Sequence, residues 1–278
     1  MSKTDVATRG AWQNDNRNFA ATINRDLLAA FHAWPLWIML GWNDIRQRYR
    51  RSTLGPFWIT LSMAVFITLL GVIYSKIFKI EIRTYLPYLT LGYIIWGFIS
   101  QTTNESSNAF QEGERIIRQI KLPYSIFVLR VVWRNFIVFL HTIVIFVPIA
   151  IVFDVRLGFV SLLALPGFAL IYINQVWVTL TLAIVCTRYR DVQQIVTTAV
   201  QIMLFVTPIM WPITALGDAP IIAYLNPLYH MIDLVRAPML GHAPSPLSWL
   251  VVIGCAMGGW TVAILLLHRA ARRLVFWL

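Results

Sequence analysis

The segment Arg46-Gln47-Arg48-Tyr49-Arg50-Arg51-Ser52-Thr53-Leu54-Gly55-Pro56-Phe57-Trp58 indicates the class of protein, because it places four arginines directly ahead of a long apolar run. Proline fixes φ and has no N–H, which suits the first turn of a new helix, so a helix is expected to begin at Gly55-Pro56. Guanidinium groups belong in water or among phosphates, whereas the residues that follow belong in hydrocarbon. The junction therefore predicts a membrane surface, and the charge bias predicts the cytoplasmic one.

The composition of the 278-residue chain indicates the same class of protein. Hydrophobic residues make up 58% of it and charged residues only 13%, far less charge than a soluble domain of this length exposes. The formal net charge of +11 raises the question of nucleic acid, but the basic residues lie between apolar segments rather than on one soluble face. The sequence predicts an all-α, polytopic membrane protein that binds no nucleic acid.

Six apolar runs, each near the ~20 residues that cross a bilayer, follow the junction. They predict transmembrane helices at about 57–77, 86–104, 124–152, 159–186, 193–214 and 248–268. Basic residues concentrate on the flanks that share a side with the N-terminus, which predicts that both termini are cytoplasmic.

The segments outside these runs divide the chain further. Residues 1–26 read as a polar tail, and residues 27–52 as an amphipathic helix along the membrane surface, with a helix packed on a soluble domain as the alternative. Residues 53–278 form the transmembrane domain. Within it, 208–246 holds seven prolines, so it cannot be one spanning helix and instead fits re-entrant half-helices on the outer side.

Several motifs resemble one membrane-protein family. The residues from Arg48 to Trp58 are similar to the start of the first spanning helix in type-2 ABC exporter permeases, most of all in the branch that exports O-antigen, capsule and teichoic acid. The resemblance covers almost the whole chain from about residue 30. It continues, in the same order, through Pro87-Tyr88-Leu89-Thr90-Leu91-Gly92, Trp96, Leu122-Pro123, Val128 to Asn135, Tyr189-Arg190-Asp191, Pro208-Ile209-Met210-Trp211-Pro212 and Asn226-Pro227.

This resemblance implies an assembly in the bacterial inner membrane. Two copies of the chain would pair with two ATPase subunits and export an undecaprenyl-linked polysaccharide, with 105–121 as a coupling segment and 215–246 as an outer gate. The chain has no G-x-x-x-x-G-K-[S/T] motif, so ATP and Mg²⁺ are expected in the partner and no cofactor in this chain. The competing readings are a small-molecule or haem exporter, a glycolipid-modifying enzyme, and a scaffold without transport.

Basic residues form two candidate sites for the lipid headgroup of the substrate. On the third span, Arg130, Arg134 and His141 lie close to one helical face, where charges either pair and snorkel or contact a lipid pyrophosphate along the pathway. At the junction, Arg46, Arg48, Arg50 and Arg51 determine topology, and they could also capture the pyrophosphate.

The remaining candidates belong to a conduit and to the ATPase contact. The fifth span places amides, a hydroxyl and a ring on one face, which suits either helix packing or a sugar conduit between two copies. Aromatic residues on the first two spans suit a conduit or an interfacial belt. The conduit candidates are Trp58, Phe66, Tyr74, Tyr93, Trp96, Gln194, Thr197, Gln201 and Phe205. The candidates for ATPase contact are Glu112, Arg115, Arg118, Arg188, Arg190 and Asp191. No catalytic set and no metal-ligand spacing is present.

Overall fold

The structure is a computed structural model, and it describes residues 19–50, 55, 57–216, 221–271 and 273–278. All regular elements in these residues are helical. They are α2 (Phe19–His32), α3 (Trp34–Arg48), α4 (Phe57–Ile77), α5 (Ile82–Ser106), α6 (Ala109–Glu112), α7 (Glu114–Gln119), α8 (Ser125–Thr142), η2 (Ile143–Ile145), α9 (Phe146–Val152), η3 (Phe159–Leu163), α10 (Ala164–Arg188), α11 (Val192–Val206), η4 (Ile213–Leu216), α12 (Ile221–Tyr224), α13 (Pro227–Met239), α14 (Pro246–Ala270) and α15 (Leu274–Trp277).

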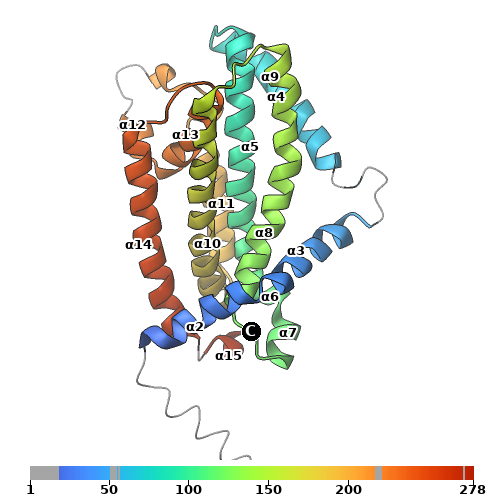
Figure 1. Cartoon of the computed structure of the whole chain (residues 1–278), viewed down its shortest axis with the longest axis vertical. Coiled ribbons are helices and arrows are strands. Elements are labelled where there is room, and N and C mark those ends of the chain that lie inside the picture. The colour runs from blue at the N-terminus through green and yellow to red at the C-terminus, as the bar shows by residue number, and fades with distance from the viewer. Residues whose placement is uncertain (1–18, 51–54, 56, 217–220, 272) are drawn as a thin grey trace, which may run out of the picture.

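The long helices run side by side as one bundle (Figure 1). One end carries α2, α3, α6, α7 and α15, and we call it the arginine-rich end. The opposite end carries α12 and the turn after α11, and we call it the proline-rich end.

Four helical segments are long and apolar enough to cross a membrane, by length and composition. They are Phe57–Ile77, Ser125–Val152, Phe159–Arg188 and Pro246–Ala270, with mean hydropathies of 2.1, 2.5, 1.8 and 2.3. The chain is therefore an all-α, multi-pass membrane protein, as the sequence predicts. Helices α5 and α11 lie in the same bundle, but α5 is more polar and α11 is shorter, with 15 residues.

Helix α5 occupies the centre of the bundle, where it contacts α4, α8, α10, α11 and α13. Leu89 and Ile95 on this helix are fully buried. The threonine hydroxyls of Thr90, Thr102 and Thr103 donate to backbone carbonyls one turn earlier in the same helix, at 2.7, 2.6 and 2.8 Å. The polar composition of α5 is therefore explained by burial among other helices rather than by contact with lipid.

Helix α4 has the opposite character and lies at the outside of the bundle (Figure 1). Large apolar side chains such as Phe57, Leu61, Leu69 and Ile77 are exposed along it. An exposed apolar face of this length suits contact with lipid chains or with another apolar helix.

Two glycines let neighbouring helices approach α10 closely. A Cβ at Gly167 on α10 would lie 2.4 Å from the Leu234 carbonyl oxygen on α13, and a Cβ at Gly259 on α14 would lie 2.1 Å from the Trp177 ring on α10. Small residues at such crossings bring helix backbones together and increase van der Waals contact in lipid. These contacts fix α13 and α14 against α10.

The surface segment predicted as one helix over 27–52 is divided into α2 and α3, which meet at Ala33. The physical reason is Pro35, which has no N–H to continue the helical ladder, so Leu36 N–H donates to the Ala33 carbonyl at 3.0 Å instead. The Trp37 indole crosses the break and donates to the Ala30 carbonyl at 3.2 Å. Helix α3 ends at Arg48, before the predicted end at residue 52: Tyr49 and Arg50 form a turn, with the Arg50 N–H donating to the Gln47 carbonyl at 3.3 Å, and residues 51–52 lie outside the described residues.

Proline also shapes the opposite end. Helix α11 ends at Val206, before Pro208, and the chain turns back through η4 and α12. Asn226 then caps α13 by accepting a hydrogen bond from the Leu228 N–H at 3.0 Å, with Pro227 in the first turn. The segment 208–246 is thus broken into short helices.

Candidate functional site

Arg134 on α8 joins four elements at the arginine-rich end. Its side chain is only 4% exposed, and its nitrogens lie 3.0 Å from Asp44 on α3, 2.8 Å from Glu105 at the end of α5 and 3.1 Å from Glu112 on α6. A buried guanidinium needs such partners because an unpaired charge away from water is costly. Arg134 therefore binds the surface segment, α5 and the segment after α5 to one helix.

Two further arginines surround this contact. Arg130 donates to both oxygens of Asp44, from Nε at 2.7 Å and from Nη2 at 2.6 Å, which is the bidentate fork of a strong pair. Arg48 lies 3.0 Å from Glu105. We call these residues the charge cluster: Asp44, Arg48, Glu105, Glu112, Arg130 and Arg134. With three arginines and three carboxylates, the cluster has no net charge.

The Glu105 carboxyl, which follows the predicted span 86–104, shows how the cluster controls ionisation. Burial by itself would raise its pKa, but the guanidinium groups of Arg134 and Arg48 and the Asn135 amide hold the pKa of Glu105 below its ordinary value. The Asn135 Nδ2 donates to the same oxygen that Arg134 contacts, at 2.8 Å. Glu105 is therefore kept ionised, as ion pairing requires.

A second aspartate fixes the other half of the surface segment. Asp26 on α2 accepts hydrogen bonds from the backbone N–H groups of Tyr124 (2.8 Å) and Ser125 (3.1 Å), and from the Ser125 hydroxyl (2.5 Å). These N–H groups lie at the beginning of α8, where helices lack internal acceptors. Helix α8 thus binds α2 through Asp26 and α3 through Asp44.

The proline-rich end contains another buried arginine, in a different setting. Arg236 on α13 is 4% exposed; its Nη1 donates to the Pro208 carbonyl at 2.8 Å, and its guanidinium carbon lies 4.0 Å from the centre of the Tyr88 ring. The Tyr88 hydroxyl donates toward the carbonyls of Pro208 and Trp211, at 3.2 and 3.3 Å. Arg236 and Tyr88 thus hold the turn 207–211, and we call them the turn clamp.

A hydrogen-bonded histidine connects the helices beside this turn. His230 on α13 is buried, with Nε2 2.8 Å from the Tyr224 carbonyl and Nδ1 3.0 Å from the Ser248 hydroxyl. Ser248 on α14 in turn donates to Asp233 at 2.7 Å. The network ties α12, α13 and α14 together. The order of its bonds, with Ser248 between the histidine and the carboxylate, is not that of a nucleophilic triad.

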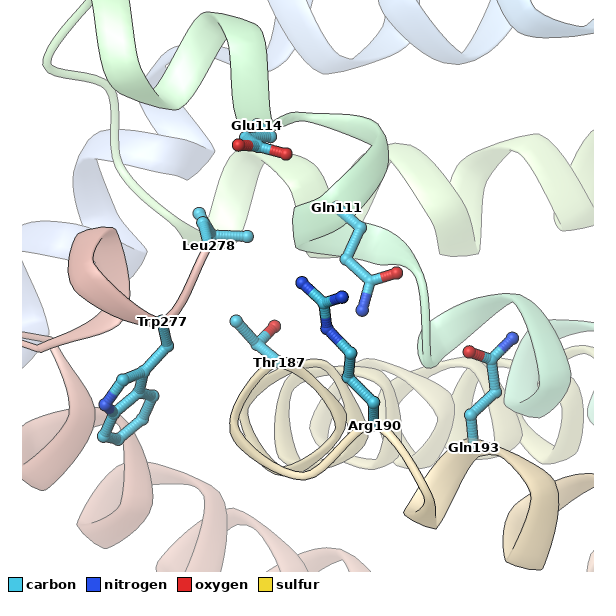
Figure 2. Close-up of a pocket in the computed structure, with 7 residues that line it drawn as sticks. All are labelled: Gln111, Glu114, Thr187, Arg190, Gln193, Trp277 and Leu278. Carbon is cyan, nitrogen blue, oxygen red and sulfur yellow. The ribbon is translucent and has the colours of Figure 1, made fainter.

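A cavity of about 200 Å³ opens at the arginine-rich end, beside the charge cluster's α6. Figure 2 shows the side chains of Gln111 and Arg190 pointing toward one another across it. The lining residues come from α6 and α7, from the end of α10 and the start of α11, and from α15: Gln111, Glu114, Thr187, Arg190, Gln193, Trp277 and Leu278. The segments 105–121 and 187–191, both predicted to contact an ATPase, therefore meet at one place.

The structure separates the candidate headgroup residues. Arg48, Arg130 and Arg134 belong to the charge cluster, whereas Arg46 and Arg50 are exposed. His141 lies elsewhere on α8, where its Nδ1 is 2.7 Å from the Ile137 carbonyl. Arg51 lies outside the described residues. The geometry favours pairing over phosphate contact for Arg130 and Arg134, and headgroup capture stays a prediction for the exposed arginines.

The conduit candidates differ in their exposure. Trp58 on α4 is exposed, and so are Gln194, Gln201 and Phe205 on α11, whose Thr197 is half-buried. Phe66 packs on Tyr93 with ring centroids 5.1 Å apart, and Tyr74 stacks on Phe78. Trp96 is buried in the core, 5% exposed. The conduit stays a prediction that concerns mainly the exposed side chains.

The residues predicted to contact an ATPase lie together at the arginine-rich end. Glu112 belongs to the charge cluster, and Arg118 pairs with Glu114 at 2.9 Å. The Arg188 guanidinium lies over the rings of Tyr189 and Trp277, at 5.2 and 5.0 Å. Arg190 lines the cavity, and Arg115 and Asp191 are exposed.

Sequence reasoning did not assign Asp26, Asp44, Glu105 or Arg236 to any site. A signal was present for the carboxylates: arginines on a span need counter-charges, and the chain has only 12 acidic residues. Asp44 and Glu105 lie just outside predicted spans, on the side of the membrane where the span that carries Arg130 is expected to begin. Arg236 lies in the predicted outer segment 215–246, where no sequence pattern distinguishes a buried arginine from an exposed one.

The model of one protein family, described as ABC-2 type transporter, matches residues 35–240. The matched range includes α3, the charge cluster, the turn clamp and most of the bundle.

Three curated relatives share the name O-antigen export system permease protein RfbA. Two come from Klebsiella pneumoniae and are 27% identical over 208 residues and 26% identical over 207, each covering 72% of this chain and 78% of the relative. The third, from Myxococcus xanthus, is 23% identical over 218 residues, which cover 74% of this chain and 81% of the relative.

Proposed function

The chain belongs to the ABC-2 type transporter family, and from this premise we propose that it is the membrane-spanning subunit of an ATP-driven exporter of lipid-linked polysaccharide, with O-antigen as its cargo. Membership of this family implies an ATPase partner. Because the sequence carries no phosphate-loop motif, ATP and Mg²⁺ bind in that partner. The cargo is supported by the names of the relatives, which align with most of the chain.

The proposed topology has six spans in the bacterial inner membrane, with the arginine-rich end and both termini in the cytoplasm. Helix α5, with 25 residues, extends about 37 Å and is long enough to cross. Helix α11 extends only about 22 Å, so it crosses together with the turn that follows it. The proline-rich segment after it forms re-entrant half-helices that act as the outer gate. The concentration of arginine at one end supports the orientation.

Two copies of the chain surround the conduit in this proposal. Gln194 and Gln201 project exposed amides from α11, and polar groups at membrane depth are stabilised by another helix or by water rather than by lipid. A second copy supplies that environment. The exposed aromatic rings of Trp58 and Phe205 offer apolar faces to sugar rings moving past them.

The observation that carries the mechanism is the contact of Arg134 with Glu112. Glu112 lies in the proposed coupling segment, and the same guanidinium holds Asp44 on the surface segment. A displacement of α6 by the ATPase subunit therefore changes the contacts of α8 and α3 together. ATP does work on this equilibrium only because it binds two arrangements of the assembly with different affinity.

Cargo enters at the same end. Arg46 and Arg50 are exposed beside the charge cluster and offer guanidinium forks that match the oxygens of a lipid pyrophosphate. Arg48 is engaged with Glu105 and connects this surface to the cluster.

Reconstitution tests the proposal. The chain and its co-expressed ATPase subunit are placed in proteoliposomes with lipid-linked O-antigen, and glycan that becomes protected from an external glycosidase is measured. We expect protection to require ATP, both subunits and an intact phosphate-loop lysine in the ATPase. Protection without the ATPase, or ATP-dependent turnover that moves no lipid-linked glycan, would overturn the proposal; the same assay with capsule or teichoic-acid precursors tests the cargo.

A further inference from the structure

Three parts of the chain line the cavity at the arginine-rich end. Two of them lie in or directly beside the segments 105–121 and 187–191, which are predicted to contact the ATPase subunit. The third is α15, whose Trp277 and Leu278 close one side. Helix α15 is anchored by Leu274, which is fully buried, and Trp277 is held by the Arg188 guanidinium over its ring. The wall is therefore attached to the α10–α11 turn rather than loosely placed.

The size of the cavity restricts what can occupy it. Pockets for small molecules and cofactors usually enclose about 300–1,000 Å³. This cavity, which is open on one side, has a volume of about 200 Å³, below that range. One protein side chain with a few waters, each taking up about 30 Å³ in the liquid, fits this volume.

The charges around the cavity favour an acidic occupant. Among the described residues, no carboxylate lies within 4 Å of the Arg190 guanidinium, while Glu114 is engaged by Arg118 at 2.9 Å. Gln111 and Gln193 add amide donors beside Arg190. The Arg188 guanidinium, 5.0 Å from the centre of the Trp277 ring, adds a second positive charge at this wall. A guanidinium flanked by amides binds a carboxylate through charge-assisted hydrogen bonds.

We propose that this cavity is a socket that receives one Asp or Glu side chain of the ATPase subunit, with Arg190 as its main contact and α15 as its third wall. The inference rests on the proposed function, since it needs that subunit. The other contacts expected with the ATPase subunit lie on the segments 105–121 and 187–191, and this proposal adds a cavity that receives a side chain of that subunit. It also makes α15 part of the surface that contacts the ATPase subunit.

Charge reversal at Arg190 tests the socket. Tagged full-length chain is co-expressed with the ATPase subunit, and the amount of ATPase that co-purifies is measured at two salt concentrations. We expect Arg190→Glu to lower it about tenfold and Arg190→Lys to lower it much less, because lysine keeps the charge but not the fork. Arg269→Glu is the matched control: an exposed arginine at the same end that does not line the cavity, expected to retain the ATPase.

Photo-crosslinking gives a second readout that does not depend on charge. A photoreactive phenylalanine derivative replaces Gln193 in the cavity, or Leu28 on the exposed face of α2 as a control. We expect only the Gln193 position to crosslink to the ATPase, at a peptide that contains Asp or Glu. A monodisperse Arg190→Glu variant that retains wild-type amounts of ATPase, or a crosslink at a segment without acidic residues, would overturn the socket.

These outcomes separate the socket from the proposed function. If the unmodified chain brings no ATPase subunit with it, the proposed function fails. If it does, and Arg190→Glu and the Gln193 probe behave like their controls, only the socket fails.

Discussion

Two buried arginines at opposite ends of the bundle are held in different ways. Arg134 contacts three carboxylates from three other elements, whereas Arg236 is held by a carbonyl and an aromatic ring, with no carboxylate within 4 Å among the residues that the structure describes. The two side chains are equally buried. The difference lies in whether the arginine's charge is neutralised by opposite charges.

These two kinds of contact determine how each end can move. Removing one partner of a buried ion pair leaves a charge uncompensated, at a cost of about 3–5 kcal/mol, so the charge cluster holds its elements in one arrangement or changes as a unit. A charged hydrogen bond to a carbonyl contributes about 1.5–3 kcal/mol, and it can pass to a neighbouring carbonyl. The turn clamp therefore allows the turn 207–211 to shift in smaller steps, which suits a gate.

The largest effect is expected from Arg134→Leu. The substitution leaves Asp44, Glu105 and Glu112 facing one another without their shared cation, and we expect a loss of about 3–5 kcal/mol in the free energy of unfolding. In detergent, the thermal midpoint should fall by roughly 10 °C. The control is Arg46→Leu, an exposed arginine near the cluster, with little expected change. Full export at normal protein level in the Arg134 variant would show that the cluster is dispensable.

A smaller and more local effect is expected from Arg236→Leu. The variant loses the hydrogen bond to Pro208 and the contact with Tyr88, worth about 2–3 kcal/mol together. Hydrogen exchange should accelerate at Ile209 and Met210 while α8 keeps its protection. The matched control, Arg83→Leu, changes an exposed arginine at the beginning of α5. Equal acceleration across all helices would mean that Arg236 supports the whole bundle, as Arg134 does.

The smallest effect on stability is expected from Glu112→Gln. Its side chain is 38% exposed and Arg134 keeps two other carboxylates, so solvent screening limits the loss to about 1 kcal/mol or less. Export should nevertheless fall several-fold, with ATP hydrolysis retained, because the link between α6 and α8 is weakened. The comparison is Glu81→Gln, an exposed glutamate at the other end. Equal export by both variants would refute transmission through Glu112.

The helices were largely predictable because their signals are local. The apolar run at 57–77 coincides with α4, and the proline at 227 marks the beginning of α13. The division of the surface segment was harder, since Pro35 is compatible with a start, a kink or a break. Helices α5 and α11 were expected from apolar content alone, although burial of α5 rather than lipid contact explains its composition.

The candidate site was less predictable because it depends on contacts between distant segments. Arg130 and Arg134 stand out as charges on an apolar helix, but their partner Asp44 is 86 and 90 residues away, respectively. The sequence of the turn 187–191 is enough to make Arg190 a candidate for ATPase contact. That Trp277 lines the same cavity follows only from the tertiary arrangement. Local periodicity indicates which face a residue occupies, not which distant segment covers it.

The continuous run of α8, η2 and α9 has a consequence for bilayer thickness. Its 28 residues extend about 42 Å, roughly 12 Å more than an average hydrocarbon layer. Asp26 and Asp44 attach α2 and α3 to its first turns, so in the proposed topology the excess length falls at this end and places Arg130 near the headgroups. In that topology α2 and α3 limit how far α8 can move into the bilayer, and we expect thicker bilayers to draw Arg134 toward hydrocarbon and to strain its ion pairs.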